Sequence, residues 1–346
     1  MVPKVFLTGG TGYIGGSVLH TLATSHPEWS IAALLRREPP AFKSTYPNIK
    51  VIHGDYDSTD LISQAAEEAN IVVHCGNSDH ESSLNAIIAG LKRREQPGFL
   101  LHLSGTGIVS DWADEEYLGR LNPKVWSDLD AASLSEIRGL PDGALHRNTE
   151  KILHSTVREQ GDKINVAVMC PPDIYGRGKG MVKTKSALIP MFVDESKKLG
   201  SVFHYGEGTN TRSWVHIDDL MRLYSHVVEV AARNEQEEVS QYFGENGYHF
   251  ASTQMHSHIE VARAVGKLLA ERGVLKSPEP VQIDLRTLDG MANIPRFLKL
   301  ARYLYASNSM TMASRAKKLW GYMGEGPGLL EALEADVVDA LGGDEN

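Results

Sequence analysis

Short apolar runs alternate with amphipathic stretches along the first half of the chain. Each run has the length of a strand and ends at glycine or at a polar residue, and the stretches between runs repeat apolar positions at helical spacing. The predicted strands cover residues 5–8, 31–35, 50–53, 71–75, 100–104 and 165–169, and the predicted helices cover residues 14–22, 61–69, 84–94 and 148–159. Apolar strands that alternate with helices are typical of a parallel sheet covered on both faces. The pattern therefore predicts an α/β fold with a doubly wound parallel sheet of the Rossmann type.

The pattern changes after residue 180, where longer helical stretches are separated by loops. These stretches cover residues 188–198, 220–232, 256–271 and 295–305. We expect them to form a smaller, mostly helical C-terminal lobe that binds the substrate. The expected division is a dinucleotide-binding Rossmann domain over residues 1–180, to which residues 205–230 return, and a discontinuous substrate lobe over residues 181–346.

Three glycines lie between the first predicted strand and the first predicted helix. Gly9, Gly12 and Gly15 have the spacing G-x-x-G-x-x-G. Glycine permits a tight turn and lets the backbone approach a pyrophosphate, which the free N–H groups and the positive end of the helix dipole attract. A purely structural turn is the alternative, but the strand, turn and helix together favour a dinucleotide site.

Two arginines end the second predicted strand, where a carboxylate would bind the ribose 2′-hydroxyl of NAD. Arg36 stands at that place and Arg37 follows it. A carboxylate repels a 2′-phosphate, whereas a guanidinium can bind it through two hydrogen bonds. Two solvated arginines at a strand end are the alternative. We interpret the pair as indicating NADP(H) rather than NAD.

Composition and charge narrow the class of protein further. The 346 residues carry a net charge of −9, which disfavours binding to nucleic acid and to anionic membranes. Cys75 and Cys170 are the two cysteines, too few for a disulfide framework, and no apolar run is as long as a membrane span. We expect a cytoplasmic monomer or homodimer with a small-molecule substrate. We expect no metal, because His256 and His258 lack the spacing of ligands on a helix.

Several motifs, in order along the chain, resemble the short-chain dehydrogenase/reductase superfamily in its extended, epimerase/dehydratase-like branch. Thr8 to Gly15 resembles the T-G-x-x-G-x-x-G turn, and Pro171 to Gly176 resembles the P-x-x-x-Y-G stretch. The segment from Arg212 to Leu220, R-S-W-V-H-I-D-D-L, is similar to the R-D-F-V-H-V-D-D-V segment of that branch. Residues 1 to about 225 are well covered by the resemblance, and the remainder is covered only weakly.

The resemblance implies which residues contact the cofactor and which face the substrate. The implied cofactor contacts include the three glycines and the two arginines. The full set is Gly9, Gly12, Tyr13, Ile14, Gly15, Arg36, Arg37, Asp55, Tyr56, Cys75, Gly76, Pro171 and Ile174. Ser104, Tyr175 and Arg212 would face the substrate, and the arginine would meet an anionic group of it. Bracing of the second lobe is an equal alternative for Arg212.

The family's catalytic set is a serine or threonine, a tyrosine and a lysine, and this chain departs from it. In the segment from Ser104 to Val109, register against the family pattern favours Thr106 as the hydroxyl that holds the substrate oxygen, with Ser104 second. The helix after the irregular stretch should open with Tyr-x-x-x-Lys. The residues there, Ala144 to Lys151, contain no tyrosine.

Two registers remain open for the missing pair. In the first, Arg147 replaces the tyrosine and Lys151 is the retained lysine, since residues four apart share a helix face. In the second, His146 replaces the tyrosine and Glu150 the lysine. Histidine exchanges protons near neutral pH, and arginine can stabilise a developing negative charge. A catalytically silent site, with His146 and Arg147 as helix caps, is the third possibility.

The sequence thus predicts an NADP(H)-dependent oxidoreductase acting on a carbonyl or hydroxyl group of a small organic metabolite. Its catalytic candidates are Thr106, His146, Arg147 and Lys151. A non-redox isomerase, cyclase or dehydratase is the first alternative, because the tyrosine is missing. A catalytically silent NADP(H) sensor is the second.

Overall fold

A seven-stranded parallel sheet forms the centre of the computed structural model, which describes residues 2–292, 294 and 297–342. The strand order is β11-β7-β5-β4-β1-β2-β3, and every neighbouring pair is parallel. The strands are β1 (Lys4–Thr8), β2 (Ser30–Leu35), β3 (Lys50–His53), β4 (Ile71–His74), β5 (Gly98–Leu103), β7 (Ile164–Cys170) and β11 (Tyr248–Phe250). The predicted doubly wound Rossmann fold is confirmed, with β11 as a strand that the sequence pattern did not indicate.

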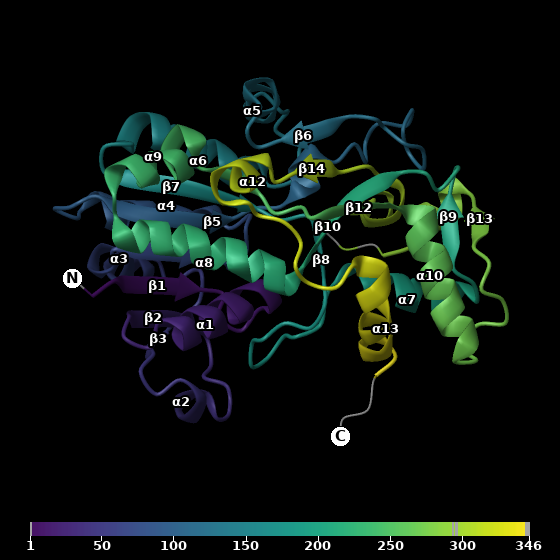
Figure 1. The fold of residues 1–346 in the computed structure, drawn as a ribbon, viewed down its shortest axis with the longest axis horizontal. Helices are drawn as coiled ribbons and strands as arrows, with labels where there is room; N and C mark the ends of the chain where they lie inside the picture. Colours follow the sequence, from purple (N-terminus) through teal and green to yellow (C-terminus); the bar gives the residue numbers. More distant parts are fainter. Residues whose placement is uncertain (1, 293, 295–296, 343–346) are drawn as a thin grey trace.

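Helices cover both faces of this sheet, because successive side chains of each strand point to opposite faces (Figure 1). Leu7 packs with the helices of one face and its neighbour Phe6 with those of the other. The first face carries α1 (Tyr13–Ser25) and α8 (Ile217–Arg233), and the second carries α3 (Thr59–Glu68), α4 (Glu81–Lys92) and α6 (Arg147–Gln160). The predicted helices in this half therefore differ from the observed ones only at their ends.

The second lobe lies beyond the carboxyl ends of the parallel strands, at the right of Figure 1. Its helices are α7 (Leu188–Leu199), α10 (His258–Glu271) and α13 (Leu329–Ala340). Its small sheets comprise β12 (Gln254–Ser257), β10 (Thr211–His216) and β8 (Asp173–Tyr175) in one, and β13 (Val281–Ile283) with β9 (Phe203–Tyr205) in the other. The expected helix over residues 295–305 begins outside the described residues, and its described part contains a π-helical turn, η3 (Arg302–Ala306).

Shorter elements lie between these helices and strands. They are α2 (Phe42–Thr45), η1 (Thr106–Val109), β6 (Val125–Ser127), α5 (Ala131–Arg138), α9 (Gln236–Tyr242), η2 (Gly244–Asn246), α11 (Leu285–Asp289), β14 (Met310–Met312) and α12 (Ser314–Trp320). The chain returns to the first lobe with α8, and again with β11 and with Ala313, Ala316 and Tyr322, which lie in the core around α1 and α8. Several later segments of the chain therefore contact the first lobe.

Candidate active site

The glycine turn lies where β1 and β4 are neighbours and the order of strands reverses. Such a switch point leaves a crevice at the carboxyl ends of the strands, where ligands of doubly wound sheets bind. Gly9 adopts φ +79°, and a Cβ there would lie 2.2 Å from the carbonyl oxygen of Cys75. A Cβ on Gly15 would lie 2.3 Å from the carbonyl oxygen of Gly9. Both positions therefore require glycine.

The first turn of α1 keeps its N–H groups available to an anion. Gly12 is the N-cap residue and supplies no side-chain cap, and no acidic residue lies in the first turn. Tyr13 turns away, because its hydroxyl donates to the carbonyl oxygen of Gly176 at 2.6 Å. A pyrophosphate fits this end of the helix, which has free donors and a positive dipole end. Ile14 packs against the core beneath.

A cleft of about 1050 Å³ continues from the glycine turn along the end of β2. Arg36 and Arg37 line it together with Thr11 and Asp55, and both guanidinium groups lack an ion-pair partner within the described residues. Asp55 also shapes the next turn, because its Oδ1 accepts from the hydroxyl of Ser58 at 2.9 Å. That hydrogen bond, the largest cause, lowers the pKa of Asp55. The cleft therefore offers two unpaired cations to a phosphate group.

The five remaining predicted cofactor residues are Tyr56, Cys75, Gly76, Pro171 and Ile174. The ring of Tyr56 rests on Gly76, where a Cβ would lie 2.7 Å from the ring. Cys75 is buried, and burial raises the pKa of its thiol to about 12, so the thiol stays protonated. The carbonyl oxygen of Pro171, directly after β7, accepts a hydrogen bond from the backbone N–H of Thr106 at 3.0 Å. Ile174 lies in β8 and is half-buried.

Thr106 begins η1, directly beyond β5, and has a glycine on each side. The residue is 3% exposed, and its hydroxyl has no hydrogen-bond partner within the described residues. A Cβ on Gly105 would lie 3.1 Å from Nε2 of His146. A Cβ on Gly107 would lie 3.0 Å from the phenol oxygen of Tyr303. The two glycines thus leave room for an imidazole and a phenol at the residues on either side of Thr106 in the chain.

His146 is held in place from behind by a carboxylate. It is the N-cap residue of α6 and adopts φ +62°, and its Nδ1 lies 2.8 Å from Oδ1 of Asp79 and 3.3 Å from the hydroxyl of Ser78. Burial is the largest single cause and acts to raise the pKa of Asp79, but the hydrogen bond from His146 and the charges of His146 and His102 together outweigh it, so the pKa is lowered. A carboxylate at Nδ1 fixes that proton and directs Nε2 toward Gly105. A carboxylate that orients a histidine, as Asp79 orients His146, is typical of general acid–base catalysis.

Arg147 and Lys151 share a helix face, as the sequence predicted, but that face is turned to the segment 138–142. Arg147 donates to the carbonyl oxygens of Leu140 at 2.9 Å and of Arg138 at 2.6 Å. Lys151 is exposed and pairs with Asp142 at 2.8 Å. The structure therefore does not bring either side chain to Thr106, and of the two registers only the one with His146 and Glu150 faces β5.

Glu150 lies one turn into α6 and is completely buried. Its Oε1 accepts from the hydroxyl of Ser104 at 2.5 Å and from that of Tyr248 at 3.0 Å, whereas its Oε2 has no partner. Burial is the largest cause of the raised pKa of this carboxyl group. Ser104, predicted to face the substrate, instead uses its proton to bind Glu150. No local pattern indicated the contribution of Tyr248, which comes from β11.

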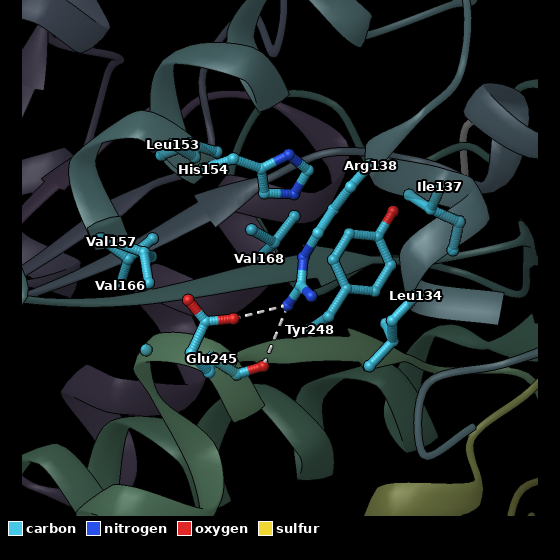
Figure 2. A pocket seen from close by; sticks show the side chains of 12 residues that line it. Leu134, Ile137, Arg138, Leu153, His154, Val157, Val166, Val168, Glu245 and Tyr248 are labelled. Atoms are coloured by element: carbon cyan, nitrogen blue, oxygen red, sulfur yellow. Dashed lines mark hydrogen bonds and ion pairs between the residues drawn. The ribbon is translucent and has the colours of Figure 1, made fainter. Parts of the chain in front are cut away.

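A small cavity lies on the outer side of Tyr248, between α5, α6 and β7 (Figure 2). Arg138 reaches across it to Glu245 at 2.9 Å, with His154 and the ring of Tyr248 beside it. Its volume of about 20 Å³ holds about one water molecule, so it cannot take a substrate. Burial is the largest cause that lowers the pKa of His154 to about 4.

Arg212 and Tyr175, both predicted to face the substrate, are tied to the protein. All three guanidinium nitrogens of Arg212 donate to protein acceptors, including a two-point contact with Asp173 at 2.5 and 3.2 Å. Tyr175 is fully buried and its hydroxyl donates to the carbonyl oxygen of Pro327 at 2.7 Å. These contacts support the bracing alternative for Arg212 and place Tyr175 in the core of the second lobe.

Comparison with known proteins agrees with this architecture. Residues 144–241 match the family model described as NAD dependent epimerase/dehydratase family. An oxidase, ucsJ, of an Acremonium species is 28% identical over 97% of both chains. The dTDP-4-dehydro-6-deoxy-D-allose reductase of Streptomyces bikiniensis is 25% identical over 82% of this chain and 87% of its own. The predicted family resemblance is confirmed.

Solved structures extend the likeness to the whole fold. The dTDP-glucose 4,6-dehydratase of Bacillus anthracis, solved in complex with NAD, superposes with a TM-score of 0.64 at 14% identity and covers 99% of this chain and 98% of its own. At this identity the likeness shows that the two chains share their fold. Within the described residues, no group of three His, Cys, Asp or Glu side chains could hold a metal ion, and no helix could cross a bilayer.

Proposed function

We propose that the protein is an NADP(H)-dependent oxidoreductase that acts on a carbonyl or hydroxyl group of a small organic metabolite. The observation that carries the proposal is the unpartnered hydroxyl of Thr106 with the imidazole of His146 at the adjoining Gly105, at the same carboxyl edge of the sheet as the glycine turn. A hydroxyl that can bind an oxygen and a group that can transfer a proton are what carbonyl reduction requires of the protein.

The residues of this chain would act in three ways. Gly9, Gly12 and the first turn of α1 would hold the pyrophosphate. Thr106 would donate a hydrogen bond to the substrate oxygen, and protonated His146, fixed by Asp79, would pass a proton from Nε2 to that oxygen. The bound nicotinamide supplies the hydride in the reducing direction. Oxidation of an alcohol uses the same groups in reverse, with neutral His146 accepting the proton.

The choice of NADP(H) rests on Arg36 and Arg37. Both line the cleft that leads from the glycine turn, and neither is neutralised by an ion pair within the described residues. A guanidinium binds a phosphate through charge-assisted hydrogen bonds, and a free pair would attract the additional 2′-phosphate. We further propose that residues 1–180 form the cofactor domain and that residues 181–346, apart from the returning segments, form the lobe over the substrate.

A non-redox isomerase, cyclase or dehydratase, or a silent NADP(H) sensor, is the alternative favoured by one observation, namely that α6 carries no tyrosine at its start. Following the nicotinamide absorbance separates these functions. We expect the protein to consume NADPH with members of a panel of small aldehydes and ketones. Product without consumption of cofactor would favour the non-redox enzyme, and binding of NADPH without product would favour the sensor.

A titration with both cofactors tests the 2′-phosphate assignment. We expect Arg36→Ala to weaken NADPH binding by roughly 10- to 100-fold, the value of a lost charge-assisted contact, and to leave NADH binding nearly unchanged. Arg158→Ala removes an exposed arginine on α6 and is the matched control. Equal losses for NADPH and NADH would contradict the assignment.

A further inference from the structure

A tyrosine from the second lobe reaches the residues around Thr106. Tyr303 lies in the π-helical turn η3, and its phenol oxygen lies 3.0 Å from the position that a Cβ on Gly107 would take. The same position is 3.1 Å from a methyl group of Leu145, the residue before His146. The phenol oxygen therefore lies beside Gly107, the residue that follows Thr106. No sequence motif marks this tyrosine.

Arg212 fixes the position of this tyrosine. Its Nη1 donates to the backbone carbonyl oxygen of Tyr303 at 2.8 Å, and its guanidinium carbon lies 4.6 Å from the centre of the phenol ring. The arginine is itself anchored by Asp173, two residues after Pro171, whose carbonyl oxygen binds the N–H of Thr106. Tyr303 and Thr106 are thus held by one continuous set of contacts, and the phenol cannot turn away without breaking the stacking on Arg212.

We propose that Tyr303 is a catalytic residue that donates a hydrogen bond from its phenol to the reacting substrate oxygen beside Thr106. It would replace, from the second lobe, the tyrosine that α6 lacks. The inference rests on the proposed oxidoreductase function and deepens it.

The chemistry balances with the groups already described. As the hydride adds to the carbonyl carbon, the electron pair of the C=O π bond moves to the oxygen, and the oxidised cofactor is left. The phenol of Tyr303 and the hydroxyl of Thr106 are neutral donors that stabilise this negative charge, and His146 then supplies the proton that completes the alcohol. Burial, the largest cause, raises the pKa of Tyr303, although the charge of Arg212 acts to lower it, so the phenol keeps its proton at neutral pH.

The test compares Tyr303→Phe with the wild type in NADPH oxidation with the same panel of small aldehydes and ketones. The substitution keeps the ring on Arg212 and removes only the hydroxyl. We expect kcat to fall by roughly 100-fold, the usual loss of one donor to a developing oxyanion, while the Kd for NADPH changes less than about twofold. Tyr46→Phe is the matched control, because its hydroxyl meets His20 at 3.1 Å near α2.

A second variant, Gly107→Ala, tests the contact between Gly107 and the phenol of Tyr303 by changing Gly107. A methyl group added by Gly107→Ala would press against the phenol oxygen, so we expect a similar loss of kcat. Full kcat in Tyr303→Phe, with His146→Ala inactive, would overturn the inference and leave the proposed function standing. Loss of NADPH binding together with kcat would show a structural role and would also overturn it. If the wild type oxidises NADPH with no member of the panel, the proposed function fails and the inference with it.

Discussion

The two ends of the proposed dinucleotide site are built in different ways. The phosphate end comes from the ends of two strands that follow each other in the chain, with residues 8–15 after β1 and Arg36 and Arg37 after β2. The glycine turn would bind the pyrophosphate mainly through its backbone geometry. The reacting end is assembled from Asp79, Thr106, His146 and, by our inference, Tyr303, which come from four separate segments. A site made by the backbone tolerates almost no substitution at its glycines, whereas a site made by side chains can exchange its members as long as the chemistry reaches the same place.

The largest effect is therefore expected at the phosphate end. Gly9→Ala introduces a Cβ that would lie 2.2 Å from the carbonyl oxygen of Cys75, at a φ of +79° that favours glycine. We expect the turn to shift and the affinity for NADPH and NADH to fall together by more than about 100-fold. Calorimetric titration with both cofactors measures this.

Gly139→Ala is the control, because a Cβ at that position meets only ordinary contacts at 3.5 Å. If Gly9→Ala binds NADPH as tightly as the wild type, the glycine turn is structural only, and the contrast between the two ends disappears.

A smaller effect, confined to kcat, is expected at the reacting end. His146→Ala removes the imidazole beside Gly105, and we expect kcat to fall by roughly 100-fold, within the usual range for a general acid. Asp79→Asn keeps the imidazole but weakens its orientation, so we expect a loss of about tenfold. NADPH binding should be retained in both. Steady-state kinetics and the cofactor Kd distinguish this pattern from a general loss of folding.

An unchanged kcat in His146→Ala would mean that the proton comes from elsewhere, and the role of the Asp79–His146 pair would be refuted. The order of the two losses is also informative, because a larger loss in Asp79→Asn than in His146→Ala would make Asp79 the reacting group.

The difference between the two ends also explains what the sequence could predict. Strands such as β1 and β4 are contiguous apolar runs, so their existence and their order along the chain follow from the pattern. β11 has only three residues, Tyr248–Phe250, and becomes a strand because it meets β7 in space. No local pattern marks it, and the role of Tyr248 at Glu150 could not be predicted for the same reason.

The choice between the two registers of α6 shows the same limit. Helical spacing correctly placed Arg147 with Lys151 on one face and leaves His146 with Glu150 on another. Which face is buried against β5 depends on the segment 138–142, whose carbonyl oxygens bind Arg147. Irregular segments of this kind carry no periodicity, so the sequence left both registers open.

The smallest expected effect concerns Glu150, which lies behind the reacting end. Because burial raises its pKa, native Glu150 keeps its proton to a higher pH than it does in the unfolded chain, where the ordinary value is 4.5. Stability is therefore lost as the pH rises from 4.5 to the native pKa, and this cost is absent at pH values below 4.5. Glu150→Gln retains an oxygen for Ser104 and Tyr248 but has no charge to bury. We expect its Tm relative to the wild type to increase by roughly 1–3 °C between acidic and mildly alkaline pH.

Glu95→Gln, at an exposed carboxylate without a partner among the described residues, should show no such trend. A Tm difference that is the same at every pH would mean that Glu150 stays protonated, or stays ionised, throughout the range. Ser104 would then have a fixed hydrogen-bonding direction, and this end of the site would be as rigidly specified as the glycine turn.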